Sequence, residues 1–112
     1  MPEPGAYENL NPREFKSRLD KGEKYRLIDV REQDEWDYCR LEGAEFMPMS
    51  QATAWAAKLA KDGGPYLVYC HHGVRSRNVC AFLAQQGVLG LYNLAGGIDR
   101  WSKEIDPKIP LY

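Results

Sequence analysis

A cysteine that ends an apolar segment is the strongest candidate for a reactive side chain in this 112-residue chain. Cys70 follows the uncharged run Tyr66–Tyr69, and Ser76 is a suitable N-cap for a helix that begins shortly afterwards. A free cysteine titrates near about 8.5, so at neutral pH most of it is an unreactive thiol. A helix N-terminus, inward-pointing backbone N–H groups and a cation such as Arg75 all favour the thiolate. The sequence therefore predicts a stabilised anionic sulfur at Cys70.

The spacing between this cysteine and the arginine discriminates between two chemistries. Phosphatases of the Cys-x5-Arg type wrap a loop of five residues around a phosphate dianion. In this chain only four residues separate Cys70 from Arg75. The shorter loop makes a smaller cradle, which fits a sulfur atom attached to the cysteine better than a phosphoryl group. The spacing favours sulfur transfer and leaves a small phosphatase as the weakest alternative.

The two adjacent histidines after the cysteine raise the question of a metal site. His71 and His72 point in different directions because they are neighbours in the chain, and with Cys70 they make a poor tetrahedral chelate. No second pair of ligand residues stands nearby in the sequence. We therefore expect no metal, and we expect the histidines to raise the positive potential over the loop.

Strand and helix signals alternate about five times along the chain, which is typical of a parallel sheet with helices on both faces. In such folds, sites form beyond the C-terminal ends of the strands, where the next helix begins, and the segment 70–76 has that position. We predict an α/β fold with a central parallel sheet of about five short strands, forming a single domain over residues 1–112. Its core spans about residues 7–105, and residues 106–112 form an extended tail. The expected strands are 27–30, 43–47, 66–69 and 91–94, and helices are expected to begin at Asn11, Ser50, Ser76 and near Ile98.

Composition excludes several classes of partner. The formal net charge is −1, so there is no general basic field to attract nucleic acid. The N-terminus has no signal-peptide pattern and no stretch has the length and apolarity of a membrane span, so we expect no membrane association. The odd number of cysteines, three, favours a reducing, cytoplasmic setting. No acidic residue occurs from Gly63 to Ile98, which predicts a locally positive loop suited to a small sulfur-bearing anion.

Four further residues have a structural interpretation. Asp29 and Arg31 end a predicted strand, and we expect them to form a buried ion pair that holds the following segment. Cys80 lies on the apolar side of the helix after the loop and is expected in the core. Cys39 is expected to be a surface or core cysteine with no functional role.

Four segments of the chain together resemble the signatures of the rhodanese-like sulfurtransferases, single-domain type. The segment 68–76 is similar to the active-site loop of that family, and 27–32 resembles its first signature. Glu42-Gly43-Ala44 resembles the second, and 94–98 with Trp101 resembles the C-terminal signature. The segments match in order and spacing from about Asn9 to Trp101. The chain departs from the family pattern at Cys39-Arg40-Leu41, where Gly-His-Ile is usual.

The resemblance implies an enzyme that transfers sulfur in two steps. The Cys70 thiolate would take the outer sulfur of thiosulfate or a related donor, form a persulfide, and pass the sulfur to cyanide or a thiol. Backbone N–H groups of the loop would stabilise the persulfide charge, and Arg75 would bind the anionic donor or steady the loop. Arg77 would help to draw anions, and no metal or organic cofactor would be needed. The loop residues expected to bind the persulfide or anion are His71, His72, Gly73, Val74, Arg75 and Ser76.

A second class of function stays open beside the enzyme. In that alternative the chain is a sulfur-carrier or regulatory binding module, and Cys70 hands sulfur to a protein partner. Thiosulfate would then be incidental.

Overall fold

The central sheet of the protein is parallel throughout. The computed structural model describes residue 2 and residues 5–112 and arranges five strands in the order β1-β5-β4-β2-β3. Every neighbouring pair of strands runs parallel. The strands are β1 (Glu8–Leu10), β2 (Arg26–Asp29), β3 (Glu45–Phe46), β4 (Tyr66–Tyr69) and β5 (Leu91–Leu94). The predicted α/β class is confirmed.

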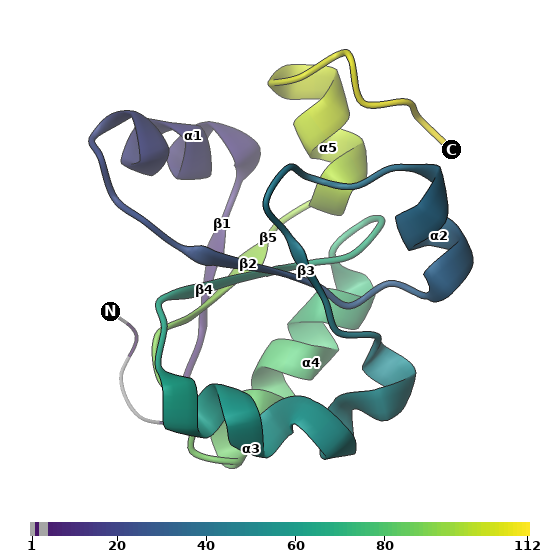
Figure 1. Ribbon diagram of the computed structural model, residues 1–112. Coiled ribbons are helices and arrows are strands. Elements are labelled where there is room, and N and C mark those ends of the chain that lie inside the picture. Colours follow the sequence, from purple (N-terminus) through teal and green to yellow (C-terminus); the bar gives the residue numbers. More distant parts are fainter. Residues whose placement is uncertain (1, 3–4) are drawn as a thin grey trace.

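Helices cover both faces of this sheet. The helices are α1 (Pro12–Asp20), α2 (Gln33–Tyr38), α3 (Ala52–Asp62), α4 (Val74–Gln85) and α5 (Gly97–Glu104), with a 3-10 turn at Met49–Gln51. Helices α1 and α5 lie on one side of the sheet and α3 and α4 on the other (Figure 1). Among the described residues, no helix combines the length and apolarity that crossing a membrane requires.

Strand β4 is buried on both faces, which explains its uninterrupted apolar sequence. Tyr66, Val68 and Cys70 belong to the core under α3 and α4, whereas Leu67 and Tyr69 belong to the core under α1 and α5. All five are at most 1% exposed. The strand therefore delivers Cys70 to the C-terminal edge of the sheet from a rigid, fully packed element.

The predicted start of α1 is confirmed in detail. The Asn11 side chain accepts a hydrogen bond from the backbone N–H of Glu14 at 2.8 Å, and the Glu14 carboxylate accepts one from the Asn11 N–H at 2.9 Å. Pro12 occupies the first turn, where its missing N–H costs nothing. This is a capping box, and it depends only on residues that are close in sequence.

Two predicted helix starts are wrong. Helix α4 begins at Val74, two residues before Ser76, because Gly73 at the N-cap adopts a left-handed conformation with φ +99°. Ser76 lies inside the first turn of α4, where its hydroxyl is close to the Cys70 sulfur and the Asn93 side chain. Ser50 lies in the 3-10 turn and does not cap α3.

Two elements, β1 and α2, have no clear signal in the sequence. Strand β1 has only three residues and pairs with β5 at the edge of the sheet. Helix α2 has six residues, mostly polar, none of which is buried, in a segment that reads as a charged connection. This short helix nevertheless supplies Glu35, which contacts the loop after β4.

The N-terminus of α5 presses directly against that loop. The Ile98 and Asp99 N–H groups donate to the carbonyls of Cys70 at 2.9 Å and His71 at 3.1 Å. Gly97 permits this approach, since its φ is +63° and a Cβ there would lie 2.5 Å from the Cys70 carbonyl oxygen. The turn at Gly96-Gly97 therefore holds the loop backbone from the outside.

Candidate active site

The sulfur of Cys70 is surrounded by hydrogen-bond donors from the first turn of α4. The side chain is 1% exposed. The backbone N–H groups of Gly73 and Ser76 point at Sγ, with N···S distances of 3.1 and 3.4 Å. The Ser76 hydroxyl oxygen is also 3.4 Å from Sγ. Donors held by a tight loop and a helix N-terminus stabilise negative charge on sulfur, so the geometry suits a thiolate.

Ser76 connects the sulfur to a residue that the sequence pattern does not single out. Its hydroxyl lies 2.5 Å from Oδ1 of Asn93, which is in β5 and only 2% exposed. The Asn93 amide nitrogen donates to Asn9 at 3.0 Å and to the Gly73 carbonyl at 3.4 Å. In the sequence, the signal that points to this network is the asparagine inside the predicted strand 91–94.

Arg75 is engaged by a carboxylate from another part of the chain. Its guanidinium forms two hydrogen bonds to Glu35 of α2, at 2.6 and 2.8 Å. The Arg75 hydrogen bonds lower the pKa of Glu35 from 4.5 to about 2, and Glu35 raises the pKa of Arg75 above its ordinary value. Arg75 therefore ties the loop to α2, which corresponds to the second of its two expected roles, that of steadying the loop. The sequence predicts a loop with no carboxylate near it. That prediction is wrong, because the fold brings the Glu35 carboxylate to Arg75.

The last residue of the chain lies over the same region. The Tyr112 hydroxyl donates to Glu35 at 2.7 Å and accepts from Arg31 at 2.7 Å. Its ring stacks on that of His71, with centroids 3.8 Å apart and planes 6° from parallel. The chain end lies beside α2 in Figure 1, and the Tyr38 and Tyr112 rings are in edge contact. The tail that the sequence predicts to be extended is thus packed against the candidate site.

Asp29 and Arg31 form an ion pair beneath this network. The Arg31 guanidinium donates to the Asp29 carboxylate at 2.7 Å, and both side chains are 0% exposed. Arg31 also donates to the backbone carbonyl of Cys39. The pair joins the end of β2 to the segment after α2, and through Tyr112 it reaches the loop.

The two histidines lie near a carboxylate of α5. One potential ligand atom from each of His71, His72 and Asp99 lies within 4.8 Å of the others, so these three residues could approach a metal ion. The Asp99 carboxylate is already paired with Lys103 at 3.0 Å. Burial and the neighbouring His72 lower the pKa of His71, whose Nε2 is buried and has no hydrogen-bond partner among the described residues. The absence of a metal stays a prediction.

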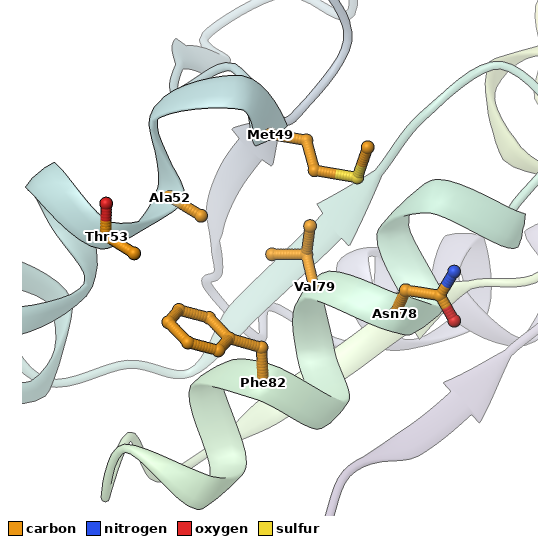
Figure 2. A pocket seen from close by; sticks show the side chains of 6 residues that line it. All are labelled: Met49, Ala52, Thr53, Asn78, Val79 and Phe82. Carbon is orange, nitrogen blue, oxygen red and sulfur yellow. The ribbon is translucent and has the colours of Figure 1, made fainter.

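Two of the cavities beside α4 bear on the site. A cleft of about 330 Å³ adjoins the loop and is lined by residues that include His72, Gly73, Arg77 and Asn93, so it places Arg77 beside the loop. An apolar pocket of about 240 Å³ lies farther along the helix and includes none of residues 70–76. Figure 2 shows the pocket between α4, which carries Val79 and Phe82, and the 3-10 turn with the start of α3. The side chains that line it are Met49, Ala52, Thr53, Asn78, Val79 and Phe82.

The chain combines a parallel sheet with a cysteine at the end of its central strand, and N–H groups at the start of the next helix point at the cysteine sulfur. The family model of the rhodanese-like domain matches residues 11–104, and the chain belongs to the rhodanese-like family. The resemblance read from the four sequence segments is confirmed.

Relatives in this family differ in how much of their length the chain covers. It is 38% identical over 105 residues to the "probable adenylyltransferase/sulfurtransferase MoeZ" of Mycobacterium tuberculosis, covering 92% of this chain and 26% of that protein. It therefore spans about a quarter of that relative. It is 31% identical over 98 residues to "thiosulfate sulfurtransferase GlpE" of Haemophilus influenzae, covering 88% of this chain and 90% of GlpE.

Solved structures support the same fold. A rhodanese-related protein from Thermoplasma volcanium superposes with a TM-score of 0.78 at 28% sequence identity, covering 95% of this chain and all of the other.

Proposed function

We propose that the protein is a sulfurtransferase that carries sulfur on Cys70 as a persulfide. The observation that carries this proposal is the convergence of the Gly73 N–H and the Ser76 N–H on Sγ, at N···S distances of 3.1 and 3.4 Å. Family membership and relatives named as sulfurtransferases support sulfur transfer in general. The chain acts as one rhodanese-like domain over residues 1–112, in a reducing cytoplasmic setting that keeps its three cysteines free.

The reaction proceeds in two displacements at sulfur. In the first, the Cys70 thiolate forms a bond to the outer sulfur of thiosulfate while the bond from that sulfur to sulfite breaks. The electron pair leaves with sulfite, and the negative charge remains on the terminal sulfur of the persulfide. In the second, cyanide or a thiolate takes the terminal sulfur, and the electron pair of the breaking bond returns to Cys70. No external oxidant or reductant enters either step.

Each loop residue has a distinct part in this proposal. The backbone from His71 to Ser76 provides N–H groups that stabilise the charge on sulfur. Arg75 is a positioning residue, because its guanidinium is held by Glu35 at 2.6 and 2.8 Å. Arg77 in the adjoining cleft attracts the anionic donor. The donor class is a small sulfur-containing anion, and the acceptor class is cyanide or a thiol, including a thiol on a protein.

Mass spectrometry of the intact protein tests the enzyme proposal. Incubation with thiosulfate should add the mass of one sulfur atom to the wild type and leave Cys70→Ser unchanged, and subsequent cyanide should remove it as thiocyanate. Mercaptopyruvate and a cysteine persulfide serve as parallel donors. No sulfur on Cys70 with any donor, or thiocyanate formation that survives Cys70→Ser, would rule the mechanism out.

A sulfur-carrier module is the second candidate, and the similarity to part of MoeZ favours it. The chain matches about a quarter of a protein whose name combines adenylyltransferase and sulfurtransferase. In a carrier, the Cys70 persulfide forms from a protein or cysteine persulfide much faster than from thiosulfate. Comparing initial loading rates among the three donors separates the two candidates.

A further inference from the structure

Asn93 is connected to the sulfur of Cys70 through one intervening side chain, that of Ser76, and it is not part of the loop motif. Its side chain is buried, and its Oδ1 atom lies 2.5 Å from the hydroxyl of Ser76. That hydroxyl is also 3.4 Å from Sγ of Cys70. The serine hydroxyl therefore stands between two acceptors, an amide oxygen and a sulfur.

The orientation of the Asn93 amide follows from its other contacts. Its nitrogen faces two oxygen atoms, Oδ1 of Asn9 at 3.0 Å and the carbonyl of Gly73 at 3.4 Å. The Gly73 carbonyl can only accept hydrogen bonds, so the NH₂ group belongs on that side. Oδ1 is thereby directed at Ser76, and it has no hydrogen to give. The Ser76 hydroxyl must be the donor in the 2.5 Å contact.

A serine hydroxyl has one proton, so it donates to one of these acceptors at a time. The short contact to the amide oxygen holds the proton on that side, and the serine oxygen then presents lone pairs to sulfur. In this arrangement a Cys70 thiol can donate to the serine, and a Cys70 thiolate is left with the backbone N–H groups of Gly73 and Ser76 at 3.1 and 3.4 Å. Fewer donors leave a thiolate more basic, and the nucleophilicity of a thiolate rises with its basicity.

We propose that Asn93 is a positioning residue that holds the Ser76 hydroxyl proton away from the Cys70 sulfur and thereby keeps the thiolate strongly nucleophilic. The proposal rests on the proposed function for its biological meaning, because sulfur transfer begins with attack by this thiolate. The arrangement itself concerns only where one proton lies. It is testable without any sulfur donor.

The charged and titratable groups around Cys70 are the same in the variants that test this idea. Arg75 lies in the same turn of α4 and is paired with Glu35. Cys80, farther along α4, is a neutral thiol, since burial raises its pKa to about 12. His71 and His72 lie in the loop, with Asp99 of α5 beside them. None of these groups contacts the Asn93 side chain by hydrogen bond.

The experiment measures alkylation of Cys70 by iodoacetamide as a function of pH, read on the Cys70 peptide by mass spectrometry. Asn93→Leu removes the acceptor at nearly constant volume and frees the hydroxyl to donate to the thiolate. The midpoint of the pH–rate profile should move about one pH unit to the acid side, as a charge-assisted hydrogen bond would produce. The plateau rate at high pH should fall about threefold, because the stabilised thiolate is less nucleophilic.

Ser76→Ala provides the control, and the pair forms a double-mutant cycle. With Asn93 present, Ser76→Ala should leave the midpoint almost unchanged, because the hydroxyl does not donate to sulfur in the wild type. In the Ser76→Ala background, Asn93→Leu should no longer move the midpoint or the plateau. Thermal unfolding of all four proteins monitors folding.

Three results would overturn the proposal. The first is a midpoint that stays in place or moves to the alkaline side in Asn93→Leu, as simple loosening of the loop would produce. The second is an equal acid shift with and without Ser76. The third, which needs no Asn93 variant, is a clear alkaline shift in Ser76→Ala alone. Absence of sulfur uptake by the wild type would refute the proposed function and leave these alkylation results interpretable.

Discussion

Glu35→Gln measures how strongly α2 stabilises the loop around Cys70. The substitution keeps the shape of the side chain and removes its charge. In the wild type, the Glu35 carboxylate accepts two hydrogen bonds from Arg75 and one from the Tyr112 hydroxyl. The variant weakens the first two from charge-assisted to ordinary contacts and leaves the Arg75 charge without its partner.

The size of the effect follows from the pKa of Glu35. Arg75 is the largest cause of its lowering from 4.5 to about 2. At about 1.4 kcal/mol for each pKa unit, this lowering corresponds to about 3 kcal/mol of folding free energy. The Arg75 side chain is 32% exposed, and solvent screening reduces the value. We expect Glu35→Gln to lower the free energy of unfolding by about 1–2 kcal/mol at pH 7.

The pH dependence has a definite sign. A carboxyl group whose pKa is lowered by folding stabilises the protein above its unfolded pKa, and this contribution disappears as the pH falls through the folded value. The difference between wild type and Glu35→Gln should therefore be constant above about pH 5 and shrink steadily between pH 4.5 and 2. Urea unfolding at a series of pH values measures this difference.

Glu42→Gln is the matched control. Glu42 is exposed, and its substitution makes the same change in charge away from the loop. It should alter the free energy of unfolding by less than about 0.5 kcal/mol. If Glu35→Gln behaves like this control at pH 7, or if its effect is the same at pH 7 and pH 2.5, the ion pair does not stabilise the loop as reasoned.

Substitutions at three further positions, Tyr112, Gly97 and Arg31, test other contacts by thermal or urea unfolding. Tyr112→Phe should cost about 1 kcal/mol by losing the hydroxyl bridge while keeping the histidine stack, and Tyr112→Ala should cost about 1 kcal/mol more; equal losses would mean that the stack contributes nothing. Gly97→Ala should cost about 2 kcal/mol or more, because its Cβ would collide with a loop carbonyl, whereas Gly22→Ala, with open space around it, should cost only about 1 kcal/mol. Arg31→Met should cost about 3–5 kcal/mol by leaving the buried Asp29 carboxylate unpaired; a loss under about 1 kcal/mol would contradict the buried-pair interpretation.

Signals that lie within a few residues of one another predicted the structure well. The helix start predicted at Asn11 is confirmed, since both partners of its capping box, Asn11 and Glu14, are close in sequence. The strand predicted at 66–69 is confirmed, and its continuous apolar run corresponds to burial on both faces of the sheet. The predicted cap at Ser76 is wrong because Gly73 turns the chain earlier, and a cap assignment from residue type alone misses that turn.

The elements without a signal are those whose formation depends on distant partners. Strand β1 is a strand because it pairs with β5, more than eighty residues later in the chain. Helix α2 buries none of its residues, so no apolar periodicity marks it. Yet α2 provides Glu35 and β5 provides Asn93, and both contact the candidate site although the loop motif does not contain them.

The sequence by itself determined the class of sheet, the place of Cys70 at the end of a buried strand and the spacing that favours sulfur chemistry. These properties follow from local apolar patterns and from the short loop that links the strand to the next helix. Only the tertiary structure decided the electrostatics of the loop. No acidic residue occurs within Gly63–Ile98, but the fold brings carboxylates to this segment from other elements. Glu35 contacts Arg75, and Asp99 lies near His72. Charges act through distances in space, and a parallel sheet gathers at one edge residues that are far apart in the chain.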